Sequence, residues 1–452
     1  MTAPPPGFWH GSWATGPAPA TTGGTERTSG WDVLLVSLAG VVLVTTWRVQ
    51  DLFPILATVQ FPLVAAAAAY GTYFLDRGRL RTLSGIRHPV TTLAIVLFVL
   101  MMASVPWSVY PGLSFRFIFN DHIKTLLMML LIAASIRRVT DVQRLANVLV
   151  VGASLYAFVV LTSVRVGESG RLGELWYYDA NDLGMLLAAT LPLMIYAVRP
   201  GVSLTRRLLG LVGICLAMLT IVKTGSRGGF LALLACGAYL LFGFQAIPKR
   251  VRVASVALVA VLFMALANDH YWDMMGTLLH PTQDYNWTGK NEVGRMEIWK
   301  RGIGYMLGRP LVGVGANAFP VAEGTISPLA GRQAIGIGLK WSAAHNSFVQ
   351  IGAEIGVGGL LVFLAMLYRA GRTLCRIGQL GRGSRGARPE PALAQVLTAT
   401  LIGYCVGGFF LSQAYSPFLY AVLGIVVGLA KVTRPWAMMA AAVPVAPRGR
   451  VV

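Results

Sequence analysis

The sequence predicts an all-α polytopic membrane protein with about 12 transmembrane helices and one long, partly helical external loop. Three observations predict this class: 55% of the 452 residues are hydrophobic, only 12% are charged, and the mean hydropathy is +0.64. An ordinary soluble protein carries about twice that share of charged residues. The composition therefore excludes a disordered chain and a soluble enzyme of usual composition.

Twelve mostly apolar runs approach the length that a helix needs to cross a bilayer, which is about 20 residues. The fourth run is short, and the seventh and eighth are separated only by the polar turn Thr224–Arg227. The runs lie near residues 31–48, 52–75, 90–109, 123–136, 145–165, 181–198, 207–223, 228–245, 251–267, 346–368, 393–412 and 416–433.

The loops between these runs alternate in their content of basic residues. One set of loops, together with the two tails, contains 24 of the 38 Lys and Arg residues, and the positive-inside rule places this set in the cytoplasm. The formal net charge of +20 is thus a topology signal, and the prediction includes no nucleic-acid partner. Both termini are expected in the cytoplasm.

This topology divides the chain into five parts. The first is rich in Pro, Gly and Thr, which is typical of a disordered tail. We expect a cytoplasmic tail at 1–30, helices 1–9 in 31–267, an external loop at 268–345, helices 10–12 in 346–436 with a basic cytoplasmic linker at 370–391, and a second cytoplasmic tail at 437–452.

The long external loop 268–345 contains a segment with helical periodicity. Between Gly294 and Leu307 apolar side chains recur on one face, whereas Arg301 lies on the opposite face. This pattern predicts an amphipathic helix on the outer membrane surface, with Arg295 near the lipid headgroups.

Cationic groups and a histidine gather at the predicted outer ends of these elements. Arg227 begins the eighth span, Arg295 begins the amphipathic helix, and His345 precedes the tenth span. Arginine offers phosphate oxygens a planar fork of donors, and histidine titrates near neutral pH. The set suits a lipid-diphosphate leaving group held by arginine and an acceptor hydroxyl deprotonated by histidine. Alternatively, each arginine is a snorkelling anchor and the histidine is a structural cap.

Other polar residues near the outer face have two interpretations. Asp179 and Asp182 either cap the sixth span or orient an acceptor sugar. In the second case Trp176 and Tyr177 would stack on that sugar, and Asn346 would be a further glycan contact.

Glu354 lies inside the tenth span, on the helix face opposite His345, and we interpret it as part of a polar network. The sequence contains no CxxC pair and no convincing ligand cluster at the predicted outer face. We therefore predict neither a metal nor a cofactor.

A set of motifs in a fixed order resembles the O-antigen ligase/polymerase superfamily of bacterial envelope glycan assembly. Together with the spans and the long loop before the histidine, the likeness covers about residues 90–435. The motifs are Asp179–Asp182 before a span, the turn Thr224–Gly228, Gly294–Arg295 with Trp299, Gly308–Gly315, and Ala344–Phe348.

The resemblance implies a GT-C-like, inverting and metal-independent glycosyltransferase that uses an undecaprenyl-diphosphate-linked glycan as donor. It matches His345 to the residue that activates the acceptor hydroxyl, and Arg227 and Arg295 to the diphosphate ligands, with Arg309 as a third. It also implies a multi-pass protein of the bacterial inner membrane, in contact with the lipid bilayer, whose active site faces the periplasm.

The sequence does not decide which molecule supplies the acceptor hydroxyl. Lipid A–core is the first expectation, which corresponds to an O-antigen ligase. A growing glycan chain corresponds to an O-antigen or exopolysaccharide polymerase, and a protein hydroxyl to a protein O-oligosaccharyltransferase. A lipid-linked oligosaccharide transporter is the non-enzyme alternative, although the sequence shows no internal repeat of the kind that transporters have.

Overall fold

A computed structural model describes most of the chain between residues 30 and 442. Trp176 and most of both predicted tails lie outside the described residues. The described residues are 30–75, 86–167, 171–173, 175, 177–199, 201–244, 248–267, 269–280, 284, 286–287, 292, 294–334, 341–380 and 389–442.

The predicted all-α class is confirmed, because every regular element among the described residues is a helix. The helices that correspond to the predicted spans are α1 (Val33–Thr46), α4 (Phe61–Leu75), α6 (Pro89–Ser104), α8 (Ile123–Ser135), α9 (Val139–Ser163), α10 (Ala180–Ala197), α11 (Leu204–Thr224), α12 (Arg227–Phe242), α13 (Lys249–Leu266), α18 (Ser347–Gln379), α19 (Pro389–Gly408) and α20 (Pro417–Ala442). Shorter helices connect them: α2 (Val49–Leu52), α3 (Pro54–Thr58), η2 (Val105–Trp107), α7 (Pro111–Phe117), the π-helical turn η3 (Ile118–His122), α14 (Asp269–Gly276), α15 (Arg295–Gly308), α16 (Phe319–Thr325) and α17 (Gly331–Ala334).

Within the described residues, seven helical stretches are long and apolar enough to cross a membrane. Five shorter apolar helices accompany them, and each of the twelve predicted runs overlaps one member of the combined set. The exact count of twelve spans stays a prediction, because the apolar stretches of these five helices are only 10–17 residues long, less than a typical bilayer-spanning helix needs.

Two runs differ from the prediction in their local form. The run at 52–75 is divided between α3 and α4, because Gln60 adopts a positive φ of 52°, which a helix does not accommodate. The short fourth run is extended, since α7, η3 and α8 together form the apolar stretch Pro111–Ser135.

The two predicted cytoplasmic segments near the C-terminus are partly helical. Helix α18 continues to Gln379, through the first half of the linker predicted at 370–391. Helix α20 continues to Ala442, past the boundary predicted at residue 436. Both extensions are rich in residues with good helix propensity, such as Arg, Leu, Met and Ala, so the helices need not end where the apolar run ends.

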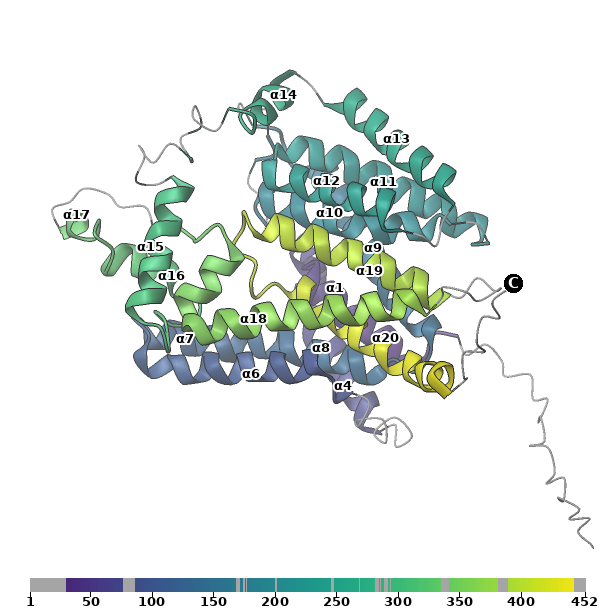
Figure 1. The fold of residues 1–452 in the computed structure, drawn as a ribbon, viewed down its shortest axis with the longest axis horizontal. Helices are drawn as coiled ribbons and strands as arrows, with labels where there is room; N and C mark the ends of the chain where they lie inside the picture. The colour runs from purple at the N-terminus through teal and green to yellow at the C-terminus, as the bar shows by residue number, and fades with distance from the viewer. Residues whose placement is uncertain are drawn as a thin grey trace, which may run out of the picture. The chain divides into compact units, whose positions relative to one another are not determined.

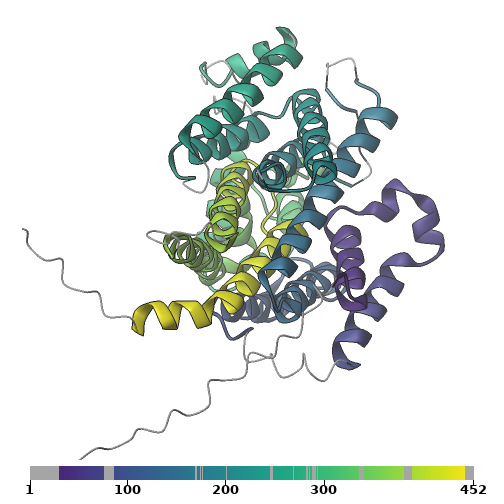
Figure 2. The ribbon, with the colours of Figure 1, turned by 90° about the vertical axis from the view of Figure 1, so that its right-hand side faces the viewer.

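Helix α10 is the most enclosed candidate span, with 83% of its apolar window buried, and it packs against α9, α11, α12 and α19. Helix α18 packs against α6, α15, α19 and α20. Figure 1 shows α18 running beside α6, with α15 and α16 at the N-terminal end of α18. In Figure 2 many of these helices are seen nearly end-on, with α1 to α4 on one side.

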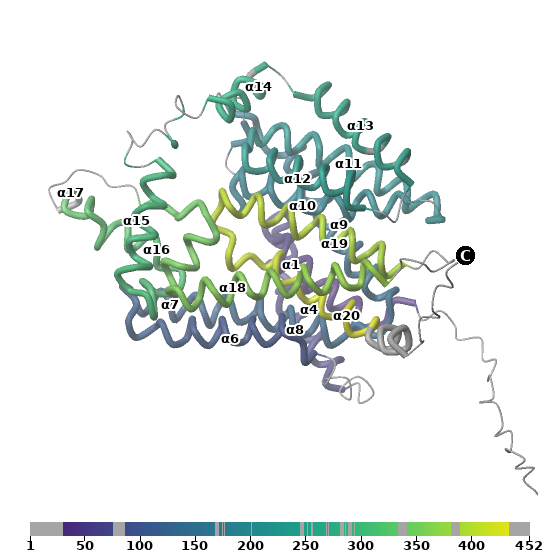
Figure 3. The backbone as a smooth tube through the Cα atoms, in the orientation of Figure 1, coloured from purple at the N-terminus to yellow at the C-terminus, as the bar shows by residue number. Residues whose placement is uncertain are grey.

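The described residues between α13 and α18 include four helices, so the predicted partly helical character of this segment is confirmed. Figure 3 labels these helices, α14, α15, α16 and α17, along the chain before α18. Helices α15 and α16 form a small second core in which Ile298, Tyr305 and Phe319 pack with Ala353 of α18. This core fixes the N-terminal ends of α15 and α18 relative to each other.

The buried face of α15 is not the predicted apolar stripe. Ile298, Gly302 and Tyr305 face the protein, and a side chain at Gly302 would collide with Val349 of α18. Leu307 of the predicted stripe stays 67% exposed. The close packing allowed by Gly302 therefore decides which face of α15 is buried. The predicted apolar stripe lies outside this contact with α18.

The glycine-rich turn after α15 docks onto a break in α18. The break lies at Gly356, whose φ is 78°, and it frees backbone groups of the helix. The N–H of Val314 donates to the carbonyl of Ala353 at 2.9 Å, and the N–H of Val357 donates to the carbonyl of Pro310 at 2.8 Å. The Gly-x-Gly turn, Gly313–Gly315, thus forms hydrogen bonds with the backbone of α18.

Glu354 completes this junction. Its buried carboxylate accepts hydrogen bonds from the backbone N–H of Asn317 at 2.9 Å, from that of Phe319 at 3.2 Å, and from the hydroxyl of Tyr415 at 2.7 Å. The interpretation of Glu354 as a polar-network residue is confirmed.

Candidate functional site

Three helix N-termini meet around a cavity of about 550 Å³. They are those of α12, α15 and α18, and they bring Arg227, Arg295 and His345 to its wall. The cavity is also lined by Arg171, Asn181, Gly225, Ser226, Gly228, Met274, Thr277, Asp284, Asn286, Ile298, Ser342, Phe410 and Leu411. The sequence placed the first three residues at helix ends, and the structure brings them together.

Arg227 is positioned by the tight turn between α11 and α12. Gly225 ends α11 in the left-handed conformation, with a φ of 58°, and Ser226 caps α12 by accepting from the N–H of Gly229 at 3.0 Å. Arg227 is therefore the first residue of α12. The partial positive charge of this helix N-terminus adds to that of the guanidinium.

The guanidinium of Arg227 is paired inside the cavity. Its Nη1 donates to the hydroxyl of Thr277 at 2.9 Å and to the carboxylate of Asp284. Burial alone would raise the pKa of Asp284, but hydrogen bonds from Asn286 and the Arg227 guanidinium outweigh it and hold this pKa below its usual value. Asp284 is therefore ionised at neutral pH, and sequence reasoning missed it.

Arg295 begins α15, whose orientation depends on Trp299. The indole Nε1 of Trp299 donates to the carbonyl of Ala344 at 3.0 Å, directly before His345. The ring of Trp299 also packs edge-on against Trp287 and Phe409. One side chain thus couples the helix that carries the arginine to the segment that carries the histidine.

His345 adopts a left-handed backbone conformation, with a φ of 48°, which is uncommon for a residue other than glycine. Its N–H donates to the hydroxyl of Ser412 at 2.8 Å, and the hydroxyl of Ser347 donates to the carbonyl of Leu411 at 2.7 Å. The connection between α19 and α20 therefore holds the histidine at the cavity. Strained backbone of this kind is often found at functional sites.

The capping role belongs to Asn346 and not to His345. The side chain of Asn346 is 2% exposed and accepts from the N–H groups of Phe348 and Val349 at 2.9 and 3.0 Å. This oxygen is committed to the start of α18, so Asn346 caps that helix, and its role as a glycan contact stays a prediction.

The predicted acceptor residues do not line the cavity. Asp179 caps α10 by accepting from the N–H of Asp182 at 2.7 Å, as the capping interpretation predicted. The ring of Tyr177 lies under the guanidinium of Arg48, at 4.4 Å. Trp176 lies outside the described residues. From this motif Asn181 lines the cavity, and the sequence analysis did not select it.

Arg171 is the third arginine of the cavity. Its Nε donates to the carbonyl of Thr224 at 2.8 Å and its Nη2 to Asn181 at 2.9 Å. Arg309, the predicted third arginine, donates instead to the carbonyl of Trp107 at 3.2 Å and does not line the cavity. In the sequence, the one feature that could have indicated a role for Arg171 is its position shortly before the Asp179 motif.

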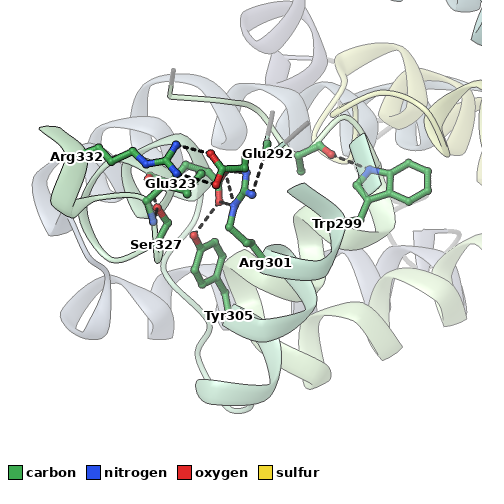
Figure 4. A network of polar contacts seen from close by, with 9 residues as sticks. Glu292, Trp299, Arg301, Tyr305, Glu323, Ser327 and Arg332 are labelled. Carbon is green, nitrogen blue, oxygen red and sulfur yellow. Dashed lines mark hydrogen bonds and ion pairs between the residues drawn. The ribbon is translucent and has the colours of Figure 1, made fainter. Parts of the chain in front are cut away.

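A second arginine–carboxylate group lies on the other side of α15 (Figure 4). Nε of Arg301 donates to both oxygens of the Glu323 carboxylate, at 2.9 and 3.0 Å, and Tyr305 donates to the same carboxylate at 2.7 Å. Burial, together with the Glu323 carboxylate, raises the pKa of Tyr305 above its usual range. Arg301 lies opposite the predicted stripe, as expected, but this face packs against α16, and the side chain of Arg301 is only 12% exposed.

Three guanidiniums and one imidazole around one cavity can bind a diphosphate and accept a proton beside it. Among the residues that the structure describes, no group of three or more His, Cys, Asp or Glu side chains is placed to hold a metal ion.

Residues 211–364 of the chain match a protein-family model, that of the O-antigen ligases. The match covers about a third of the chain, and over this segment the chain is similar to the O-antigen ligases. The segment contains Arg227, Arg295, Arg309 and His345, and the resemblance seen in the sequence is confirmed. Its long apolar helices indicate a multi-pass membrane protein, and the matched segment is similar to membrane proteins of the O-antigen ligase type. The comparison with curated proteins finds no match.

Proposed function

We propose that this protein is an inverting, metal-independent glycosyltransferase that moves a glycan from undecaprenyl diphosphate to a hydroxyl of lipid A–core. The observation that carries the proposal is the single cavity at which Arg227, Arg295 and His345 meet, in a chain whose central segment matches the O-antigen ligases. The cavity combines anion-binding groups with a base, as this reaction requires.

In this mechanism Arg227, Arg295 and Arg171 hold the diphosphate of the donor. An imidazole nitrogen of His345 accepts the proton of the acceptor hydroxyl, and the hydroxyl oxygen attacks the anomeric carbon. The bond from that carbon to the diphosphate oxygen breaks, and the configuration at the carbon inverts. The guanidiniums stabilise the negative charge that develops on the leaving diphosphate.

Asp284 has a place in the same proposal. In the absence of an anionic ligand its carboxylate neutralises Arg227. An arriving diphosphate presents more oxygens to the guanidinium than one carboxylate does, so it takes over Arg227 while Asp284 keeps its hydrogen bonds from Asn286.

The proposed location is the bacterial inner membrane, with both termini in the cytoplasm and the cavity open to the periplasm. The distribution of basic residues supports this orientation, because Arg369, Arg372 and Arg376 lie at the end of α18 opposite His345.

The test is a transfer assay with the purified protein in detergent and EDTA. Undecaprenyl-diphosphate glycan is offered with lipid A–core and, separately, without an added acceptor. We expect glycan on lipid A–core. Lengthened lipid-linked chains without acceptor would identify a polymerase instead, and recovery of intact donor in both reactions would point to a protein acceptor or a transporter.

A histidine outside the cavity provides the matched control. His280 belongs to the same segment between α13 and α18, is exposed, and does not line the cavity. We expect His345→Ala to abolish transfer and His280→Ala to leave it unchanged. Normal transfer by His345→Ala would refute the assignment of the base.

A further inference from the structure

A second cavity, of about 310 Å³, lies between the N-terminus of α6 and the C-terminal parts of α18 and α20. It is far from the first, because the part of α18 from Ser347 to Thr373 separates them by about 40 Å at 1.5 Å per residue. Arg369, Arg372 and Arg376 line it together with His88 and Thr373. The second cavity is therefore a cationic site separate from the cavity that contains Arg227 and His345.

The three arginines share one side of α18. Residues at i, i+3 and i+7 project in similar directions from a helix, so their like charges disfavour one another. All three side chains are exposed, and none of the described residues that line the cavity is a carboxylate. An anion in the cavity would relieve this repulsion.

His88 and Thr373 add a fixed polar wall. Nδ1 of His88 accepts from the N–H of Val90 at 3.2 Å, and the hydroxyl of Thr373 donates to the carbonyl of Arg369 at 2.8 Å. With Nδ1 an acceptor, Nε2 of the neutral ring is the donor to the Thr373 oxygen, 3.3 Å away. Pro89 begins α6 at this point, and the helix N-terminus contributes partial positive charge.

Apolar surface leads directly to these cationic groups. Leu361 and Tyr368 lie on the side of α18 that continues to Arg372, and they are 60% and 61% exposed. Ile377 and Leu380 line the cavity itself. A ligand that fits both parts carries a phosphate and hydrocarbon chains, which favours a lipid over a free phosphate ion.

We propose that this second cavity binds the headgroup of an anionic phospholipid, with its acyl chains along the exposed apolar side of α18. The phosphate lies among Arg369, Arg372 and Arg376. Basic pockets between the ends of membrane helices bind such headgroups by charge, and the proposal does not depend on the glycosyltransferase reaction.

Native mass spectrometry of the full chain tests this, with phosphatidylglycerol and phosphatidylcholine of the same acyl chains as probes. We expect the protein to retain phosphatidylglycerol and not phosphatidylcholine. Each arginine near an anionic headgroup contributes roughly a fivefold change in affinity, so R372Q/R376Q should weaken binding about thirtyfold. The charge-preserving pair R372K/R376K should keep most of it.

The matched control is R206Q/R207Q, which removes two exposed arginines at the start of α11. The unfolding temperature of each variant checks that it is folded. An equal loss in the control pair, or equal retention of phosphatidylcholine, would refute the site. Displacement of the lipid by excess inorganic phosphate would assign the cavity to a soluble anion and refute the lipid.

Discussion

Two arginine–carboxylate pairs lie on either side of α15, and they differ in how completely the arginine is bonded. Arg301 donates through Nε and both terminal nitrogens, to Glu323 and to the carbonyl of Glu292. Among the described residues, Arg227 donates only through Nη1, to Thr277 and Asp284. Its side chain is 24% exposed, against 12% for Arg301.

The difference separates a structural arginine from a binding one. Arg301 has its donors committed, so it fastens α15 to α16. The donors of Arg227 that face the cavity remain available for oxygen atoms of a ligand, beside Arg295 and His345. Arg227 and Arg301 are both arginines paired with a carboxylate. Their surroundings alone decide whether the arginine binds a ligand or holds two helices together.

The largest expected effect is on transfer by variants of the cavity. Arg227→Ala and Arg295→Ala should each lower the rate by about 10²–10³, because each removes a charge that stabilises the leaving diphosphate. Arg227→Lys should fall between Ala and Arg, since it keeps the charge but loses the planar fork. Initial rates in the transfer assay measure this. A mild loss in Arg227→Ala would make Arg227 a membrane anchor.

Arg301→Ala should mainly affect stability. It leaves the buried carboxylate of Glu323 without its ion partner, which typically costs about 3–5 kcal/mol of unfolding free energy. Unfolding in detergent should show this loss, and the double variant Arg301→Met with Glu323→Leu should recover part of it. Comparable destabilisation by Arg227→Ala would remove the distinction between the two pairs.

A comparison of Arg171 and Arg309 sharpens the boundary of the site. Arg171→Lys should reduce transfer about tenfold, because it loses bidentate geometry at the cavity. Arg309→Lys should change transfer by less than about threefold, since among the described residues its guanidinium donates to the carbonyl of Trp107 and lies outside the cavity wall. Parallel measurement of kcat and KM provides the test, and the reverse order of effects would restore Arg309 to the site.

Asp284→Asn should have the smallest effect, and it should be a gain. The variant keeps an oxygen for Asn286 but removes the charge that competes for Arg227. Removal of one partly exposed ion pair predicts roughly fivefold tighter binding of pyrophosphate. Calorimetry with the full chain measures it. Weaker binding would show that Asp284 orients Arg227 instead of competing for it.

The helical fold was predictable because its signals are local. Apolar runs, Gly225 after α11 and Ser226 before α12 each act within a few residues, so the order of helices and the placement of Arg227 at a helix start could be derived. The burial of Arg301 could not be derived, because helical periodicity alone does not reveal that α16 brings Glu323 against it.

The cavity depends on contacts between distant parts of the chain. Arg171 and Thr224 are 53 residues apart, Arg227 and Asp284 are 57 apart, and His345 and Ser412 are 67 apart. No periodicity or motif spacing encodes such pairings. This is why Arg171 and Asp284 were missed.

By itself the sequence determined a helical membrane protein with a resemblance to the O-antigen ligases, and with Arg227, Arg295 and His345 at helix ends. These features follow from local hydrophobicity, local turn chemistry and ordered motifs. Only the tertiary structure decided which arginines face the cavity and which are bonded elsewhere. That outcome depends on the packing of α12, α15 and α18, and on the connection between α19 and α20 that holds His345.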